Sequence, residues 1–151
     1  GERMGHVMVI DIGKCGSKSW QAEGLKNAVT RHPGVNFVIC HLLAPNGKQE
    51  EELKRALEGL ALPNVWFDLA SVPHNCMDAS EPWKRAGAYV RLARDLVGAD
   101  KLLFGTDMPS ALKEAPYGDY VRWIREMEGL NDAEREQILY QNAAKVYAGL
   151  S

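Results

Sequence analysis

Four short apolar runs, separated by stretches with helical periodicity, constrain the fold of this chain more than any other feature of its sequence. The runs are Val7–Ile12, Val35–Cys40, Val65–Ala70 and Lys101–Phe104. They are rich in Val, Ile, Leu and Phe and only a few residues long, which is typical of strands buried in a parallel sheet. Their starts lie about 30 residues apart, the size of one strand–helix unit. The chain is therefore predicted to repeat that unit.

The stretches between the runs place apolar residues at the i, i+3, i+4 and i+7 spacing of helices. We predict helices over residues 22–29, 53–60, 86–97, 120–127 and 138–147. Gly98 stands where a helix C-terminal glycine belongs, and Asn131 with Glu134 has the pattern of a capping box. Alternating strands and helices indicate an α/β fold with a parallel sheet. The 151 residues fit a single domain over residues 1–151.

Composition excludes several classes of protein. The chain has 18 basic and 20 acidic residues, without the basic excess of a nucleic-acid-binding protein. Its apolar runs are far shorter than the roughly 20 residues that span a bilayer, so no membrane partner is expected. Cys15, Cys40 and Cys76 form neither a disulfide framework nor a zinc ribbon. Free thiols fit a reducing compartment, and no basic segment followed by an apolar stretch opens the chain, so we expect a cytoplasmic protein.

Polar side chains close or follow each predicted strand. They are Asp11, His41, Asp68, Ser71, His74 and Asp107. Ligands of parallel α/β proteins bind at the carboxyl ends of the strands, so these side chains are expected to share one rim. Carboxylates and imidazoles bind divalent metals such as zinc, manganese and iron, and they can activate a water nucleophile. The irregular stretch Ser71–Pro82 is long enough to be a functional loop.

Each of these residues also has a purely structural interpretation. Asp11 and Asp107 could accept hydrogen bonds in turns, and His41 could be a partly buried histidine with one backbone partner. Asp68 lies inside its strand, where an ionised carboxylate needs partners, so it could orient a neighbouring group. His74 could simply belong to a solvated loop.

The segment GKCGSKS, residues 13–19, follows a strand and precedes a helix, as a phosphate-binding loop does. That motif needs glycines six and one residues before its lysine, but Ile12 and Ser17 stand there when Lys18 is aligned with that lysine. A nucleotide-binding sheet is therefore only a third alternative. Ser17 and Ser19 are predicted helix caps instead, and a weaker phosphate or carboxylate site at this helix start stays open.

Taken in order, the strand segments resemble the C-terminal half of amidohydrolase family 2, the branch with metal-dependent hydrolases and aromatic-acid decarboxylases. Residues 32–41 (HPGVNFVICH) resemble the family's sixth strand with its terminal histidine, and residues 64–69 (NVWFDL) resemble the seventh. Residues 101–109 (KLLFGTDMP) are similar to the eighth strand, which ends in Gly-Ser/Thr-Asp-x-Pro, and residues 142–144 (NAA) resemble the opening of the last helix. The resemblance implies the second half of a (β/α)8 TIM barrel.

The resemblance implies roles for the residues at the predicted rim. Asp107 would ligate a divalent metal and act as general base, and His41 would ligate the metal and orient water or substrate. Asp11 would stand in for the metal-binding histidine that normally ends the family's fifth strand. Zinc is the expected metal and manganese the alternative. The family's first strand carries a His-x-His or Glu-x-His pair that this sequence lacks, so the metal site in this chain is expected to be incomplete.

Ser71 and His74 would bind substrate, and Asp68 would support the catalytic residues from behind. The expected activity is that of a metal-dependent hydrolase or a non-oxidative decarboxylase of a small carboxylated or cyclic substrate. The alternative is a truncated or degenerate half-barrel module without catalysis, because the site lacks the ligands of the first strand.

Length agrees with half a barrel. A complete (β/α)8 barrel needs roughly 250 residues, against 151 residues and four predicted strands here. Half a barrel alone is expected to expose two strand edges and an apolar inner face. We therefore expect the chain to form a homo-oligomer or to pair with a missing N-terminal half.

Overall fold

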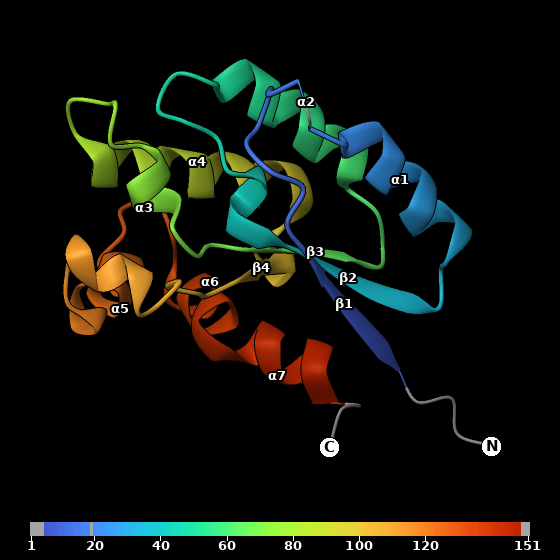
Figure 1. Ribbon diagram of the computed structural model, residues 1–151. Coiled ribbons are helices and arrows are strands. Elements are labelled where there is room, and N and C mark those ends of the chain that lie inside the picture. The colour runs from blue at the N-terminus through green and yellow to red at the C-terminus, as the bar shows by residue number, and fades with distance from the viewer. Residues whose placement is uncertain (1–4, 19, 149–151) are drawn as a thin grey trace.

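The structure is a computed structural model that describes residues 5–18 and 20–148. Its sheet consists of β1 (His6–Ile10), β2 (Val35–Ile39), β3 (Val65–Asp68) and β4 (Leu102–Leu103). The strands lie side by side in chain order and all run parallel (Figure 1). The predicted α/β class is confirmed. The strands are shorter than the apolar runs because each run continues beyond its last paired residue.

Three helices cover one face of the sheet: α1 (Ala22–Arg31), α2 (Glu50–Leu60) and α4 (Pro82–Val97). Figure 1 shows all three on the same side of the strands. The strand side chains that are buried beneath them include Phe37, Ile39, Phe67 and Leu102. Burial of one such side chain contributes about 1.5–3 kcal/mol, so this face holds the main core.

Short helices and 3-10 turns follow the strands at their carboxyl ends. The turn η1 (Cys40–Leu43) follows β2, and η3 (Ser110–Lys113) lies beyond β4. The stretch predicted to be irregular, residues 71–82, contains a helix after all, α3 (Val72–Asn75), because Pro73 stands in its first turn, where a missing N–H costs nothing. A further turn, η2 (Ala99–Lys101), leads into β4.

After β4 the chain forms α5 (Tyr117–Arg125) and then one interrupted helix. This interrupted helix consists of α6 (Asp132–Glu136), the π-helical turn η4 (Gln137–Gln141) and α7 (Asn142–Tyr147), and we call it the C-terminal helix. The predicted capping box is confirmed, since the Asn131 side chain accepts from Glu134 N and the Glu134 side chain accepts from Asn131 N. The helix therefore begins at Asp132, directly after the predicted cap and six residues before the apolar stripe that starts at Ile138.

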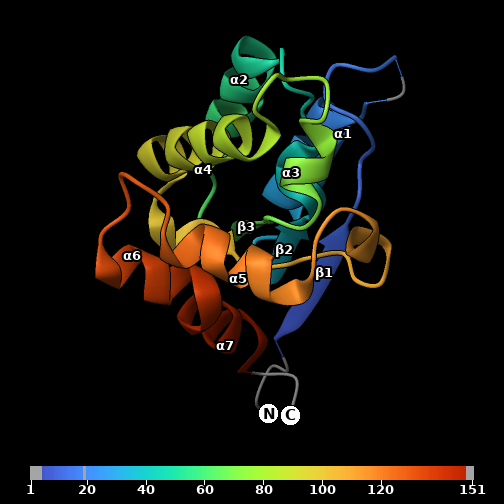
Figure 2. The ribbon, with the colours of Figure 1, turned by 90° about the vertical axis from the view of Figure 1, so that its left-hand side faces the viewer.

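The C-terminal helix crosses to the other face of the sheet. Val146 of α7 is buried in a second cluster with Val38 and Leu103, which point away from the main core. Figures 1 and 2 both place α7 on the side opposite α2 and α4. The expectation that half a barrel leaves its inner face fully open is therefore wrong for this part of the face, because the chain's own last helix packs on it.

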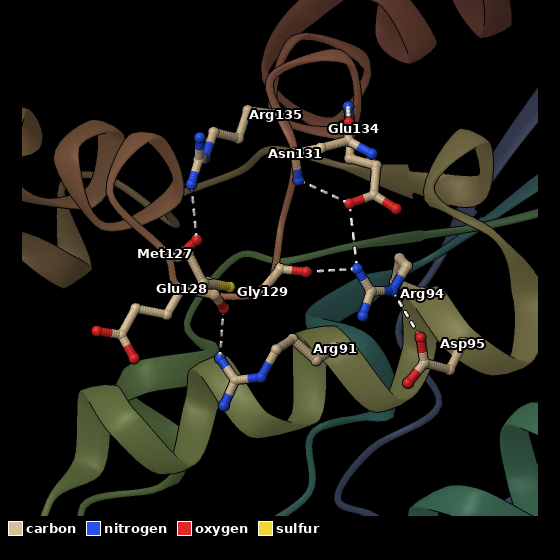
Figure 3. Close-up of polar contacts among 9 residues, drawn as sticks. All are labelled: Arg91, Arg94, Asp95, Met127, Glu128, Gly129, Asn131, Glu134 and Arg135. Carbon is tan, nitrogen blue, oxygen red and sulfur yellow. Dashed lines mark hydrogen bonds and ion pairs between the residues drawn. The ribbon is translucent and has the colours of Figure 1, made fainter.

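A group of arginines fixes the connection between α5 and the C-terminal helix (Figure 3). Arg91 donates to the Glu128 carbonyl, Arg94 to the Gly129 carbonyl and Arg135 to the Met127 carbonyl. Arg94 also pairs with the capping Glu134 at 3.1 Å. We call these arginines, with residues 127–129 and Glu134, the polar clasp. Since α4 carries Arg91 and Arg94, the clasp ties the connection to the main core.

Two further predictions concern residues 13–19 and the membrane. The N-cap of α1 is Gln21, and no side chain caps that helix, so the prediction of Ser17 as a cap is wrong. Ser19 lies outside the described residues. Among the residues that the structure describes, no helix is both long and apolar enough to cross a membrane.

Candidate active site

The predicted rim residues gather where the parallel strands end. Asp11 follows β1, His41 lies in η1 after β2, Ser71 follows β3 and Asp107 follows β4. His41, Ser71 and Asp107 have left-handed backbone conformations, with φ of 59°, 58° and 63°. Such a conformation costs an L-residue about 1–2 kcal/mol. Backbone strain of this kind gathers at functional sites, so its presence on three predicted site residues marks this rim.

The imidazole of His41 is held in one orientation and one tautomer. Its Nδ1 lies 2.9 Å from the Ala70 carbonyl oxygen, and since a carbonyl oxygen only accepts, Nδ1 carries the proton. In the neutral ring, Nε2 is therefore an acceptor. It lies 3.9 Å from Oδ2 of Asp11. Two acceptors that face each other across this gap suit a group between them that donates protons or is positively charged.

Asp68 fixes the backbone around His41. Its Oδ1 accepts from the backbone N–H of His41 at 2.9 Å and from that of Ala70 at 3.1 Å. The structure thus places Asp68 behind the rim and not on it. The same carboxylate acts on the neighbouring Cys40: burial first, then the charge of Asp68 and a hydrogen bond to it, raise the pKa of the Cys40 thiol to about 12.

The turn interpretation of Asp11 is also correct. Its Oδ1 accepts from Gly13 N at 2.8 Å, which makes a two-residue turn after β1. The other oxygen, Oδ2, still faces His41, and the side chain is 58% exposed. The structural role of Asp11 and its place at the rim are therefore compatible.

Ser71 and Asp107 form a pair. The buried Ser71 hydroxyl donates to Asp107 Oδ2 at 2.8 Å, while Asp107 itself is exposed. The hydrogen bond holds one carboxylate oxygen in place and leaves the other, Oδ1, available to a reactant. A carboxylate in this position can take a proton from water or from a substrate.

His74 lies on α3, which begins directly after Ser71. Its Nδ1 pairs with Oε1 of Glu114 at 2.8 Å. Sequence reasoning missed Glu114, because it has no regular spacing from any strand and only the chain's return after β4 brings it close. His74 also lines a cavity of about 390 Å³ together with Lys14, Ser17 and Asn46, among others. His74 thus shares a cavity with the loop after β1.

The described residues do not form a complete metal site. No group of three or more His, Cys, Asp or Glu side chains in residues 5–18 and 20–148 is placed to hold one ion. Two donors on one tetrahedral zinc, each about 2.1 Å from it, lie about 3.4 Å apart, somewhat less than the 3.9 Å between His41 and Asp11. The predicted set Asp11, His41 and Asp107 is therefore not assembled as a three-donor centre.

Comparison with known proteins decides the family. A family model described as amidohydrolase matches residues 6–149. The chain belongs to the amidohydrolase family. This amidohydrolase chain is 31% identical over 102 residues to an L-fucono-1,5-lactonase of Burkholderia ambifaria, an alignment that covers 62% of this chain and 33% of that protein.

Solved structures show the same fold. An amidohydrolase of Burkholderia multivorans with bound zinc matches with a TM-score of 0.79 at 23% identity, over 93% of this chain and 52% of that one. A 5-carboxyvanillate decarboxylase of Sphingomonas paucimobilis matches with a TM-score of 0.58 at 15% identity, over 82% and 37%. The amidohydrolase chain thus spans a third of its curated relative and about half of the first of these structures, as expected for the second half of a TIM barrel.

Proposed function

We propose that this chain is the C-terminal half of a hydrolase that opens a small cyclic ester, with His41 and Asp107 as its contribution to catalysis. The observation that carries the proposal is the left-handed backbone of His41, Ser71 and Asp107 at one rim of the sheet. Hydrolysis is favoured over decarboxylation because a relative that is 31% identical over 102 residues is a lactonase. A small carboxylated substrate that loses carbon dioxide is the alternative within the same family.

Asp107 is the proposed general base. Ser71 holds one of its oxygens at 2.8 Å, so the other can remove a proton from the attacking water. His41 presents Nε2 as an acceptor in a fixed orientation, because Ala70 and Asp68 hold its ring and its backbone. In this role His41 orients the water or a hydroxyl of the substrate. Ser71 acts through Asp107 and not on the substrate.

A divalent metal, zinc before manganese, is proposed for the complete protein, since relatives are described with these ions bound. The described residues do not make such a site alone. His41 and Asp11 are the donors that this chain offers, and the remaining donors would come from an N-terminal half. Pairing with that half is proposed as the state in which the enzyme works, with a homo-oligomer as the alternative.

The test is a kinetic comparison in the active protein that contains this chain, with aldonolactones and hydroxybenzoic acids as substrates. We expect His41→Ala and Asp107→Asn each to lower kcat for lactone opening by about 10²-fold or more. The exposed His32 provides the matched control, and His32→Ala should leave kcat unchanged. Full activity in both rim variants would refute the proposal. Carbon dioxide release from the acids without lactone opening would replace hydrolysis by decarboxylation.

A second candidate is a non-catalytic half-barrel, because no group of three metal donors forms within the part of the chain that the structure describes. Metal analysis of the protein after purification without chelators separates the two. Stoichiometric zinc or manganese favours the enzyme, and a folded protein without bound metal and without lactone opening favours the module.

A further inference from the structure

The cavity of about 390 Å³ that His74 lines lies beside the rim, between the loops that follow β1, β2 and β3. Each loop contributes a residue three positions after a rim residue: Lys14 after Asp11, Ala44 after His41 and His74 after Ser71. Three residues of chain span at most about 11 Å, so the wall of the cavity begins within that distance of the rim. Its volume falls within the range of about 300–1,000 Å³ that small-molecule sites occupy.

The loop that carries Lys14 is fixed by its neighbour Cys15. The Cys15 N–H donates to the Ala44 carbonyl at 3.2 Å, and the Cys15 carbonyl accepts from Gln49 Nε2 at 2.8 Å. Gly16, with φ of 71°, comes so close to Gln49 that an added Cβ would lie 3.0 Å from Nε2. The main chain around Lys14 is therefore held in place without a ligand, which lowers the entropic cost of binding one.

Two amide side chains of the cavity have donors left for a ligand. The side-chain oxygen of Asn46 accepts from Lys48 N at 2.9 Å, and that of Gln49 accepts from Asn46 N at 3.0 Å. Within the part of the chain that the structure describes, Asn46 Nδ2 has no hydrogen-bond partner, and Gln49 Nε2 uses one of its two N–H groups on Cys15. The oxygens of both amides are thus bonded, and N–H groups remain.

The charge of the cavity wall is positive. Lys14 lines it, and there is no Asp or Glu among the described residues that do so. Two carboxylates act on lining residues: Glu114 is paired with His74 at 2.8 Å, and Glu52 acts on Cys15. Burial first, and then Glu52, raise the pKa of the Cys15 thiol to about 11, so this thiol adds no negative charge at neutral pH. An ammonium group and N–H donors without a lining acid favour an anionic oxygen group.

We propose that this cavity binds a carboxylate of the substrate, with Lys14 as its ionic partner and the Asn46 amide as a donor. The rim suits such a group poorly, because Asp11 and Asp107 are carboxylates themselves. The inference rests on the proposed function in one respect: the bound carboxylate is a substituent of the cyclic ester that His41 and Asp107 open. The cyclic ester therefore has an acidic group besides the bond that is hydrolysed.

Binding to this chain is tested by an NMR titration that follows the main-chain amides of Lys14, Gly16 and Asn75, which line the cavity. Glutarate should shift these amides, and δ-valerolactone, an uncharged molecule of similar size, should not. Lys14→Met keeps the length of the side chain and removes its charge, so it should weaken glutarate binding by about tenfold or more. The matched control is Lys18→Met at an exposed position outside the cavity, and it should bind glutarate as the unchanged chain does.

Three results of the titration would overturn the proposal: no shift of these amides with glutarate, equal affinity in folded Lys14→Met, or an equal response to δ-valerolactone. Inorganic phosphate is titrated in parallel. If phosphate binds at the same amides more tightly than glutarate, the cavity belongs to a free phosphate and the assignment to the substrate is wrong.

A second test uses the active protein that contains this chain, with a lactone that carries a carboxylate and the same lactone without it. Lys14→Met should raise KM for the carboxylated lactone by about tenfold more than KM for the other, with kcat changed less than about twofold. An equal rise in both KM values would refute a role of Lys14 in specificity. The titration needs no activity, so it decides on the cavity even if no lactone is opened. Failure of the titration leaves His41 and Asp107 to their own kinetic test.

Discussion

The polar clasp and the rim use the same backbone conformation with different residues. In the clasp the left-handed position is Gly129, with φ of 85°, and in the rim the left-handed positions include His41, Ser71 and Asp107. A glycine adopts this conformation without strain, whereas the backbone of His41, Ser71 and Asp107 is strained by it. The clasp needs no side chain at Gly129, because its arginines donate to main-chain carbonyls. The rim needs side chains at the sharp turns, so the strain marks where chemistry is expected.

The largest effect is expected where the clasp loses a charge. Arg94→Met should lower the free energy of unfolding by about 2–3 kcal/mol, because Arg94 bonds Gly129 and Glu134 with its side chain only 22% exposed. Denaturant unfolding measures the change. Arg122→Met is the control: its pair with Asp119 is exposed, so less than about 1 kcal/mol should be lost. Equal losses in both variants would show that the clasp is no stronger than a surface ion pair.

The next effect concerns the glycine of the clasp. Gly129→Ala should cost about 2 kcal/mol, since alanine is strained at this φ and its Cβ would lie 2.7 Å from Cδ of Arg91. Gly59→Ala is the matched control in α2, where no atom lies within 4 Å of the added carbon; it should stabilise the chain by up to about 1 kcal/mol. Thermal unfolding of the two variants should therefore shift in opposite directions.

At the rim, relief of backbone strain should raise the free energy of unfolding. Ala44 ends the left-handed turn after His41 with φ of 48°, so Ala44→Gly should raise the free energy of unfolding by about 1 kcal/mol. The same exchange within α1, Ala28→Gly, should lower it by about 1 kcal/mol. A destabilising Ala44→Gly would mean that the left-handed turn is not strained, and the contrast with the clasp would disappear.

The smallest expected effect is on the reactivity of the Cys40 thiol. Burial and Asp68 raise the pKa of Cys40 from 9.0 to about 12, so the folded chain holds this proton more tightly than the unfolded chain. The resulting stabilisation is present below about pH 9 and is lost as the pH rises toward 12. Asp68→Asn removes the charge and keeps an acceptor for His41 N, so alkylation of Cys40 at pH 9 should become faster. Cys76 serves as the reference, because Asp78 and not Asp68 acts on its thiol. Mass spectrometry that finds no change at Cys40 would refute the effect of Asp68.

Much of the fold was predictable from local pattern. The apolar runs predicted all four strands, because buried parallel strands have a simple composition, and Asn131 with Glu134 predicted a helix start, because a capping box is a local interaction. The π-helical turn within the C-terminal helix was not predictable. It depends on Phe104, which meets Ile138 only through the fold.

The candidate site shows the same division. The positions of Asp11, His41, Ser71 and Asp107 after their strands predicted a shared rim. The hydrogen-bond partners did not follow from spacing, because Ala70 meets His41, and Glu114 meets His74, only through contacts between distant segments.

By itself, the sequence determined the kind and order of the elements, the parallel sheet and the residues at its carboxyl edge, because periodicity and strand ends are local properties. The tertiary structure decided which acceptors face each other and which donors do not meet. It also decided that the last helix packs on the face of the sheet opposite α1, α2 and α4 (Figure 1). These outcomes depend on how buried hydrogen-bonding groups find partners across the whole chain, and no local pattern records that.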